Sequence, residues 1–153
     1  MPIQRVFSGP IMLACAVLAC GGPATSPGDN ASDPSRLLLA HGLEQSVSLV
    51  PSMPVAGQNL TIRSVITNHG AQPVELESRH CGLDFAGDLA LEWPPGIGKC
   101  AAYSGRGPLQ PGDSVATTDI MRVSSPPGRY RVRVRHALAP EAWVELSVVV
   151  RAP

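Results

Sequence analysis

The chain of 153 residues carries 12 basic and 12 acidic residues, so its formal net charge at neutral pH is zero. That balance argues against a nucleic-acid-binding protein, because such proteins normally carry a clear basic excess. Sixteen prolines and 15 glycines, with few aromatic residues, are typical of an all-β domain rich in turns rather than of a helical one.

The first 19 residues have the pattern of a secretory leader. Arg5 precedes an apolar segment at residues 11–19, which is too short to span a hydrocarbon core of about 30 Å. Cys20 follows Ala19 and precedes two glycines. This order resembles the lipobox of bacterial lipoproteins, in which the cysteine is acylated and becomes the mature N-terminus.

The lipobox resemblance implies an exported protein that is anchored in a membrane of the cell envelope through lipidated Cys20. In a host with two membranes, the expected place is the outer membrane or the periplasmic face. The alternative is an ordinary signal peptide, cut near Ala19, that leaves Cys20 as a free thiol.

The lipoprotein interpretation divides the chain into three expected regions. These are a signal peptide at residues 1–19, the lipidated cysteine with a flexible linker at residues 20–45, and a folded domain at residues 46–151. Residues 21–35 are rich in Pro, Gly and Ser and contain nothing able to nucleate a core, so they are expected to form a tether. Residues 36–45 include three consecutive leucines and fit either a short helix or an irregular entry strand.

From residue 46 onward, apolar and polar residues alternate in short runs that Pro and Gly interrupt. The expected strands are residues 46–50, 59–67, 73–78, 83–85, 89–93, 114–121, 129–136 and 143–150. Seven or eight strands at intervals of roughly ten residues predict a β-sandwich. The core is expected to consist mainly of Leu60, Ile62, Ile66, Leu76, Leu83, Phe85, Leu91, Tyr130, Val132, Val134, Leu146 and Val148.

Three turn motifs occur in a definite order along this region. Residues 67–76 read TNHGAQPVEL, residues 109–114 read LQPGDS, and residues 127–132 read PGRYRV. Their order and spacing resemble the BsuPI-type intracellular proteinase inhibitor domain. The resemblance covers residues 46–150 and implies an immunoglobulin-like sandwich, with protease inhibition as the implied activity.

Each motif also has a structural reason of its own. Asn68 is suited to an Asx turn that fixes a hairpin, and Pro111 with Gly112 is suited to a tight turn. Tyr130 stands near the start of the penultimate strand, where a tyrosine-corner hydroxyl bonds back to the preceding loop. These expected roles are architectural and require no ligand.

Two cysteines remain once Cys15 leaves with the leader and Cys20 is committed to lipid. In an oxidising compartment, Cys81 and Cys100 are most simply a disulfide, which for a loop of about 20 residues is worth roughly 3 kcal/mol. Exported relatives in the BsuPI-like family often carry a cysteine pair at this place. Two buried thiols, or half of a metal site, are the alternatives.

The run at residues 129–136 places Arg129, Arg131, Arg133 and Arg135 on one predicted strand face. Such a row is suited to an anionic partner. The simpler interpretation is a solvated face that is neutralised by acids of the next strand, with Glu141 and Glu145 well placed.

Trp93, Pro94 and Pro95 are a second candidate for partner binding, in a proline-braced loop that Cys100 bounds. A rigid exposed loop lowers the entropy cost of binding. The alternative is that Trp93 belongs to the core and that the prolines only form a turn.

The sequence contains no Gly-x-Ser-x-Gly, Ser-x-x-Lys or His-Glu-x-x-His motif, so we expect neither an enzyme nor a cofactor. Copper binding is a third hypothesis, because imidazole and sulfur ligands occur in an exported chain. No pair has a metal-site spacing, so no metal ligand is assigned. The residues considered were His41, Met53, His69, His80, Cys81 and His136.

Together these observations predict a non-catalytic binding module, held to the membrane by its N-terminal lipid and directed at an envelope protein. Neither a nucleic acid nor a small-molecule substrate is expected. The alternative is a structural or assembly factor of the envelope, which binds its protein partner through a sheet edge or the arginine-rich face.

Overall fold

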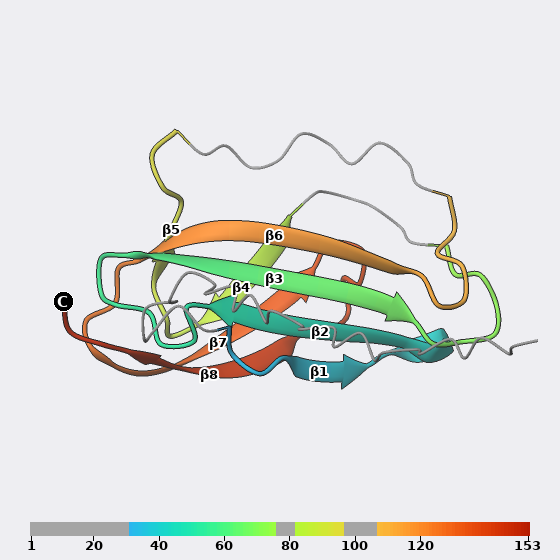
Figure 1. Ribbon diagram of the computed structural model, residues 1–153, viewed down its shortest axis with the longest axis horizontal. Helices are drawn as coiled ribbons and strands as arrows, with labels where there is room; N and C mark the ends of the chain where they lie inside the picture. The colour runs from blue at the N-terminus through green and yellow to red at the C-terminus, as the bar shows by residue number, and fades with distance from the viewer. Residues whose placement is uncertain (1–30, 76–81, 97–106) are drawn as a thin grey trace, which may run out of the picture.

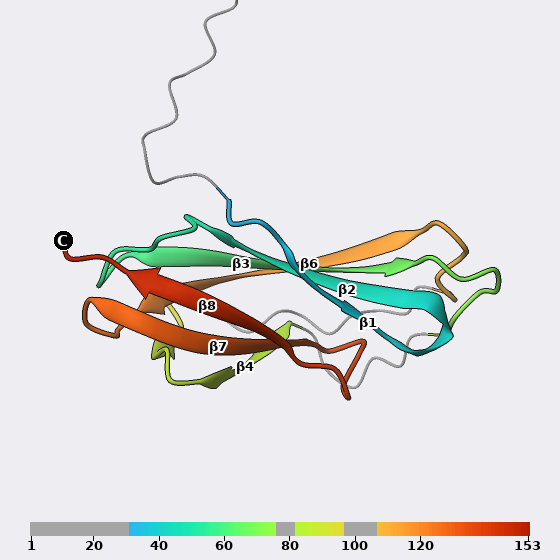
Figure 2. The ribbon, with the colours of Figure 1, turned by 90° about the horizontal axis from the view of Figure 1, so that it is seen from below.

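The computed structural model describes residues 31–75, 82–96 and 107–153, which form two antiparallel β-sheets packed face to face (Figures 1 and 2). The five-stranded sheet has the order β1 (Ser35–Leu38), β2 (Leu43–Val50), β3 (Asn59–Asn68), β6 (Ser114–Val123) and β5 (Leu91–Glu92). The three-stranded sheet has the order β4 (Leu83–Gly87), β7 (Gly128–His136) and β8 (Val144–Val150). A single 3₁₀ turn, η1 (Ala40–Gly42), joins β1 to β2.

This strand order is that of an immunoglobulin-like sandwich. In the constant-type immunoglobulin domain, strands A, B, E and D form one sheet and strands C, F and G the other. In chain order, β2 to β8 take the places of A to G, and β1 is added at the edge beside β2. The predicted fold class is therefore confirmed.

The described residues contain no helix that is long and apolar enough to cross a membrane.

The ordered sheet begins earlier than the expected domain boundary at residue 46. Residues 35–38 form β1, which pairs antiparallel with β2, and β2 itself starts at Leu43. Of the two interpretations of residues 36–45, the strand is the better one, although a 3₁₀ turn interrupts it. Leu37 packs against the core on the inner side of β1, and this burial gives the segment a reason to join the sheet.

Two other expected strands differ from the prediction in the described part of the chain. From residues 73–78, the described part contributes only one antiparallel bridge, between Val74 and Leu109. Residues 73–75 therefore do not return along β3 as a hairpin, because β2 and β6 already occupy both edges of β3. The run at residues 89–93 is reduced to the two-residue strand β5.

The described residues form two hydrophobic clusters inside the sandwich. The larger one includes Val47, Leu60, Ile62 and Val134, and the smaller one includes Ile66. Among the expected core residues, Leu60, Ile62, Ile66, Leu83, Val132, Val134, Leu146 and Val148 are buried. Phe85, Leu91 and Tyr130 are half-buried against the larger cluster, and Leu76 lies outside the described residues.

A layer of buried polar side chains separates the two clusters. Gln45 Nε2 donates to Ser64 Oγ at 3.2 Å between β2 and β3. On the three-stranded sheet, His136 Nδ1 accepts the backbone N–H of Leu138, two residues further along the chain, at 3.0 Å. Asp119 Oδ2 accepts the backbone N–H of Leu83 at 2.8 Å and so links β6 to β4 of the other sheet.

The expected turn devices are present. The hydroxyl of Tyr130 donates to the carbonyl oxygen of Pro126 at 2.8 Å, which is the hydrogen bond of a tyrosine corner. Asn68 Oδ1 accepts the backbone N–H of Gly70 at 2.8 Å and closes an Asx turn. Gly112, at φ 83°, follows Pro111 in a turn. The backbone N–H of Asp113 donates to the carbonyl oxygen of Gln110 at 3.0 Å and closes this turn.

Candidate binding face

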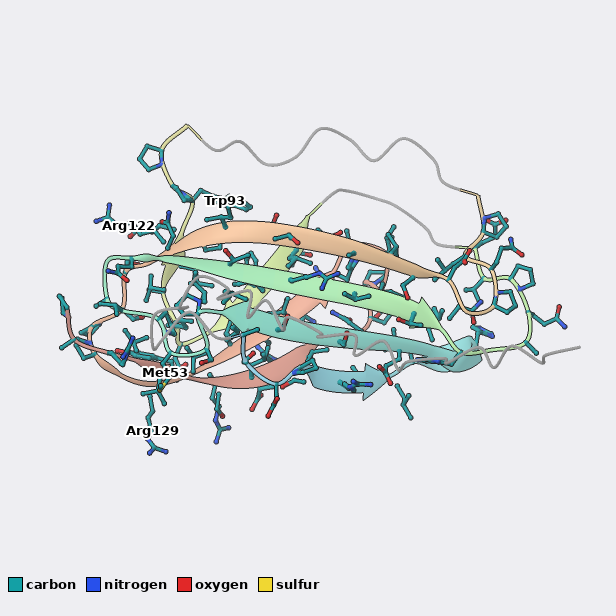
Figure 3. The ribbon with its side chains drawn as sticks, in the orientation of Figure 1. Met53, Trp93, Arg122 and Arg129 are labelled. Atoms are coloured by element: carbon teal, nitrogen blue, oxygen red, sulfur yellow. The ribbon has the colours of Figure 1, made fainter. Side chains whose placement is uncertain are left out.

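The arginine residues of β7 all point to the outer side of the three-stranded sheet. Val132 and Val134 face the core and are buried, whereas Arg129, Arg131 and Arg133, which alternate with the inward-facing residues, are exposed. Figure 3 shows the Arg129 side chain pointing away from the ribbon. We call the outer surface around Arg129, Arg131, Arg133 and Arg135 the arginine face. The prediction that these four residues share one side of a strand is confirmed.

Arg135 is fixed at one end of the row. Its Nη2 and Nε atoms donate to Asp84 Oδ2 at 2.7 and 3.0 Å, and its Nη1 donates to the carbonyl oxygen of Pro140 at 3.0 Å. Asp84 is brought to this place by β4, in which it lies directly across from Arg135. Such a charge-assisted pair holds the guanidinium in a single orientation.

Trp143 supports two of the arginines at once. The guanidinium carbon of Arg135 lies 4.7 Å from the indole centroid, and that of Arg133 lies 5.6 Å from it. Both distances are in the range of cation–π contacts, which are worth about 0.5–1 kcal/mol at exposed sites. The indole therefore orders the guanidinium groups that stack on it.

Acidic side chains neutralise part of this face. Arg131 Nη1 lies 3.7 Å from Glu145 Oε1, with the two side chains 74% and 54% exposed, so this ion pair is weak. Asp88 Oδ1 accepts the backbone N–H of Arg131. Among the described residues, no carboxylate lies within 4 Å of the guanidinium of Arg129 or Arg133.

Neutralisation by the next strand was thus predicted correctly for Glu145 but wrongly for Glu141. Glu141 makes no ion pair with an arginine in the described part of the chain. The loop between β7 and β8 instead turns its carbonyl oxygen at Pro140 toward Arg135. Asp84 takes the role that Glu141 was expected to play.

Trp143 and Asp84 were not among the predicted site residues. Trp143 was detectable in principle, because it stands two residues before Glu145 and alternation places both on the outer side of the last strand. The contact of Asp84 could not be predicted, because its position beside Arg135 depends on β4 pairing with β7 in one particular register.

A shallow groove borders the arginine face. Its volume is about 630 Å³, and Trp143 belongs to its wall. Leucines from β1 and the β1–β2 turn, Val74 and the β7–β8 loop supply most of the apolar lining. The exposed side chains of His41, Glu75 and Glu141 complete it.

The second candidate, Trp93 with Pro94 and Pro95, has a different environment. Trp93 is half-buried and packs against the larger hydrophobic cluster, at the β5 side of the sandwich (Figure 3). Pro94 is half-buried and Pro95 is exposed. This packing favours the core interpretation of Trp93. The loop beyond Gly96 lies outside the described residues.

The histidines considered as metal ligands are dispersed. His41 and His69 are exposed, whereas His136 is buried, and burial lowers its pKa to about 4. Within the described ranges, no group of three or more His, Cys, Asp or Glu residues is arranged to hold a metal ion. His80 lies outside these ranges.

The lipidation site Cys20 and the predicted disulfide partners Cys81 and Cys100 also lie outside the described residues. Lipidation and the disulfide therefore stay predictions.

Comparison of the chain with protein-family models, with curated proteins and with solved structures found no match.

Proposed function

We propose that the chain is a non-catalytic binding module of the cell envelope, tethered by a lipid at Cys20, that holds a protein partner on the arginine face. One observation carries the proposal. Four guanidinium groups stand in a row on one sheet face, where Asp84 and Trp143 hold one end of the row in place.

The composition of this face supports a protein partner. Arginine and tryptophan are enriched at the energetic centres of protein interfaces. Arg133 and Arg135 are ordered by Trp143 before any partner arrives, so less side-chain entropy is lost on binding. Exposed guanidinium groups also steer an acidic surface toward the face during encounter.

The place of the tether is compatible with this role. The described chain enters beside β1, on the five-stranded sheet, whereas the arginine face belongs to the three-stranded sheet on the opposite side (Figure 2). The 14 residues of the expected linker between Cys20 and Ser35 span at most about 50 Å when extended. An anchored domain can therefore turn the arginine face away from the bilayer.

Capture from solubilised envelope tests the partner. We expect cross-linking to the wild-type domain to yield a discrete partner, and the double variant Arg131→Glu, Arg133→Glu to lose it. The matched control is Arg63→Glu with Arg122→Glu, because these exposed arginines lie on the outer side of β3 and β6. Equal capture by both double variants would contradict the proposal.

Mass spectrometry of the mature N-terminus tests the anchor. A lipid-modified Cys20 is expected, and an unmodified terminus would remove the membrane part of the proposal.

Protease inhibition, which the BsuPI resemblance implies, is tested separately. Because Trp93 packs on the core rather than projecting, we expect a large molar excess of the mature domain to leave serine-protease activity unchanged. Stoichiometric inhibition would restore the inhibitor hypothesis.

A further inference from the structure

We propose that the occupant of the arginine face is an extended acidic segment of the partner, lying along β7, with carboxylates on alternate residues. This inference rests on the proposed function and specifies the chemistry of the partner.

The spacing of the arginines is the first argument. Residues two apart in a β-strand point to the same side and are separated by about 6.5–7 Å along it. An extended partner segment repeats at the same distance, so that every second side chain of the partner meets one arginine. Consecutive acidic residues would instead point to opposite sides of the segment.

Three arginines are available to such a segment. Arg135 is committed to Asp84 and Pro140. Arg129 and Arg133 have no carboxylate within 4 Å in the described part of the chain. The exposed pair of Arg131 with Glu145, at 3.7 Å, costs little to exchange for another carboxylate.

The guanidinium group supplies the chemical selectivity. Its planar fork binds a carboxylate through two parallel hydrogen bonds, a geometry that a lysine ammonium does not offer. All four basic residues of the row are arginine. Stacking on Trp143 keeps the fork of Arg133 ordered.

An exposed apolar side chain on the neighbouring strand adds to this face. Val149 of β8 lies opposite Arg129, is 39% exposed and offers an apolar contact to a partner side chain that faces the sheet.

Short peptides test the spacing directly. We compare a peptide in which Glu and Thr alternate with one of identical composition in which the Glu residues are consecutive, by fluorescence anisotropy at low salt. The alternating peptide is expected to bind the wild-type domain roughly tenfold more tightly, a difference of about 1.4 kcal/mol. Arg131→Glu is expected to abolish this preference, and Arg63→Glu to leave it unchanged.

Failure of this inference is distinguishable from failure of the proposed function. Equal binding of both peptides, or tighter binding of a helical peptide with Glu at every fourth position, would overturn the extended register. So would the absence of peptide binding. In each case, arginine-dependent capture of a protein from the envelope would still support the proposed function. A circular dichroism spectrum of each variant that matches the wild type shows that the fold is retained.

Discussion

His136 makes the stability of this domain depend on pH, and the magnitude follows from its burial. The imidazole is 1% exposed, and desolvation lowers its pKa from 6.5 to about 4. Its Nδ1 atom accepts the Leu138 N–H, an interaction that only the neutral ring can make. Protonation therefore disfavours the folded state.

The sign and size of the effect follow from linkage. Between pH 6.5 and 4 the unfolded chain binds a proton at His136 that the folded chain does not, so stability falls as the pH is lowered through this window. The stabilising contribution of neutral His136 is fully present above the pKa that this residue has in the unfolded chain. A pKa difference of about 2.5, at 1.36 kcal/mol per unit, makes it about 3 kcal/mol.

Urea denaturation of the wild type and of His136→Asn, each measured from pH 7 to pH 4, tests this reasoning. Asparagine still presents an oxygen to the Leu138 N–H but does not titrate. We expect the variant to lose about 3 kcal/mol less stability across the window than the wild type loses.

The control is His41→Asn. His41 is exposed and adopts φ 59°, a conformation that asparagine tolerates. This variant is expected to keep the wild-type pH dependence. If His136→Asn and the wild type lost equal stability between pH 7 and pH 4, the assignment of the effect to buried His136 would be refuted.

Three further substitutions report on the devices that position the arginine face and the fold. Tyr130→Phe removes the bond to Pro126 and is expected to cost about 1 kcal/mol in urea denaturation, so an unchanged midpoint would contradict the tyrosine corner. Asn68→Ala removes three hydrogen bonds from a buried side chain and is expected to cost about 3 kcal/mol, whereas a loss below about 1 kcal/mol would show that the loop repacks. Trp143→Ala is expected to cost about 1 kcal/mol more than Trp143→Phe, because only the phenyl ring keeps a face for Arg135. Equal stabilities would argue against the stacking.

The local features of this protein follow from its sequence alone. Period-two alternation predicted most strands and the common face of the arginines on β7, because the pleat directs successive side chains to opposite sides whatever lies across the strand. Asn68, Gly112 and Tyr130 were equally predictable, since each turn depends on the residue's own side chain and on a backbone nearby in the chain.

Which side chains meet across strands was decided only by the tertiary structure. Asp84 pairs with Arg135 across 51 positions of sequence, and Val74 bridges to Leu109 rather than folding back on β3. The pairing of β4 with β7 and the order of the two sheets create these contacts. Alternation specifies the side on which a residue lies, but not its neighbour across the strand, and it is the neighbours, Asp84 and Trp143, that order the arginines at one end of the row.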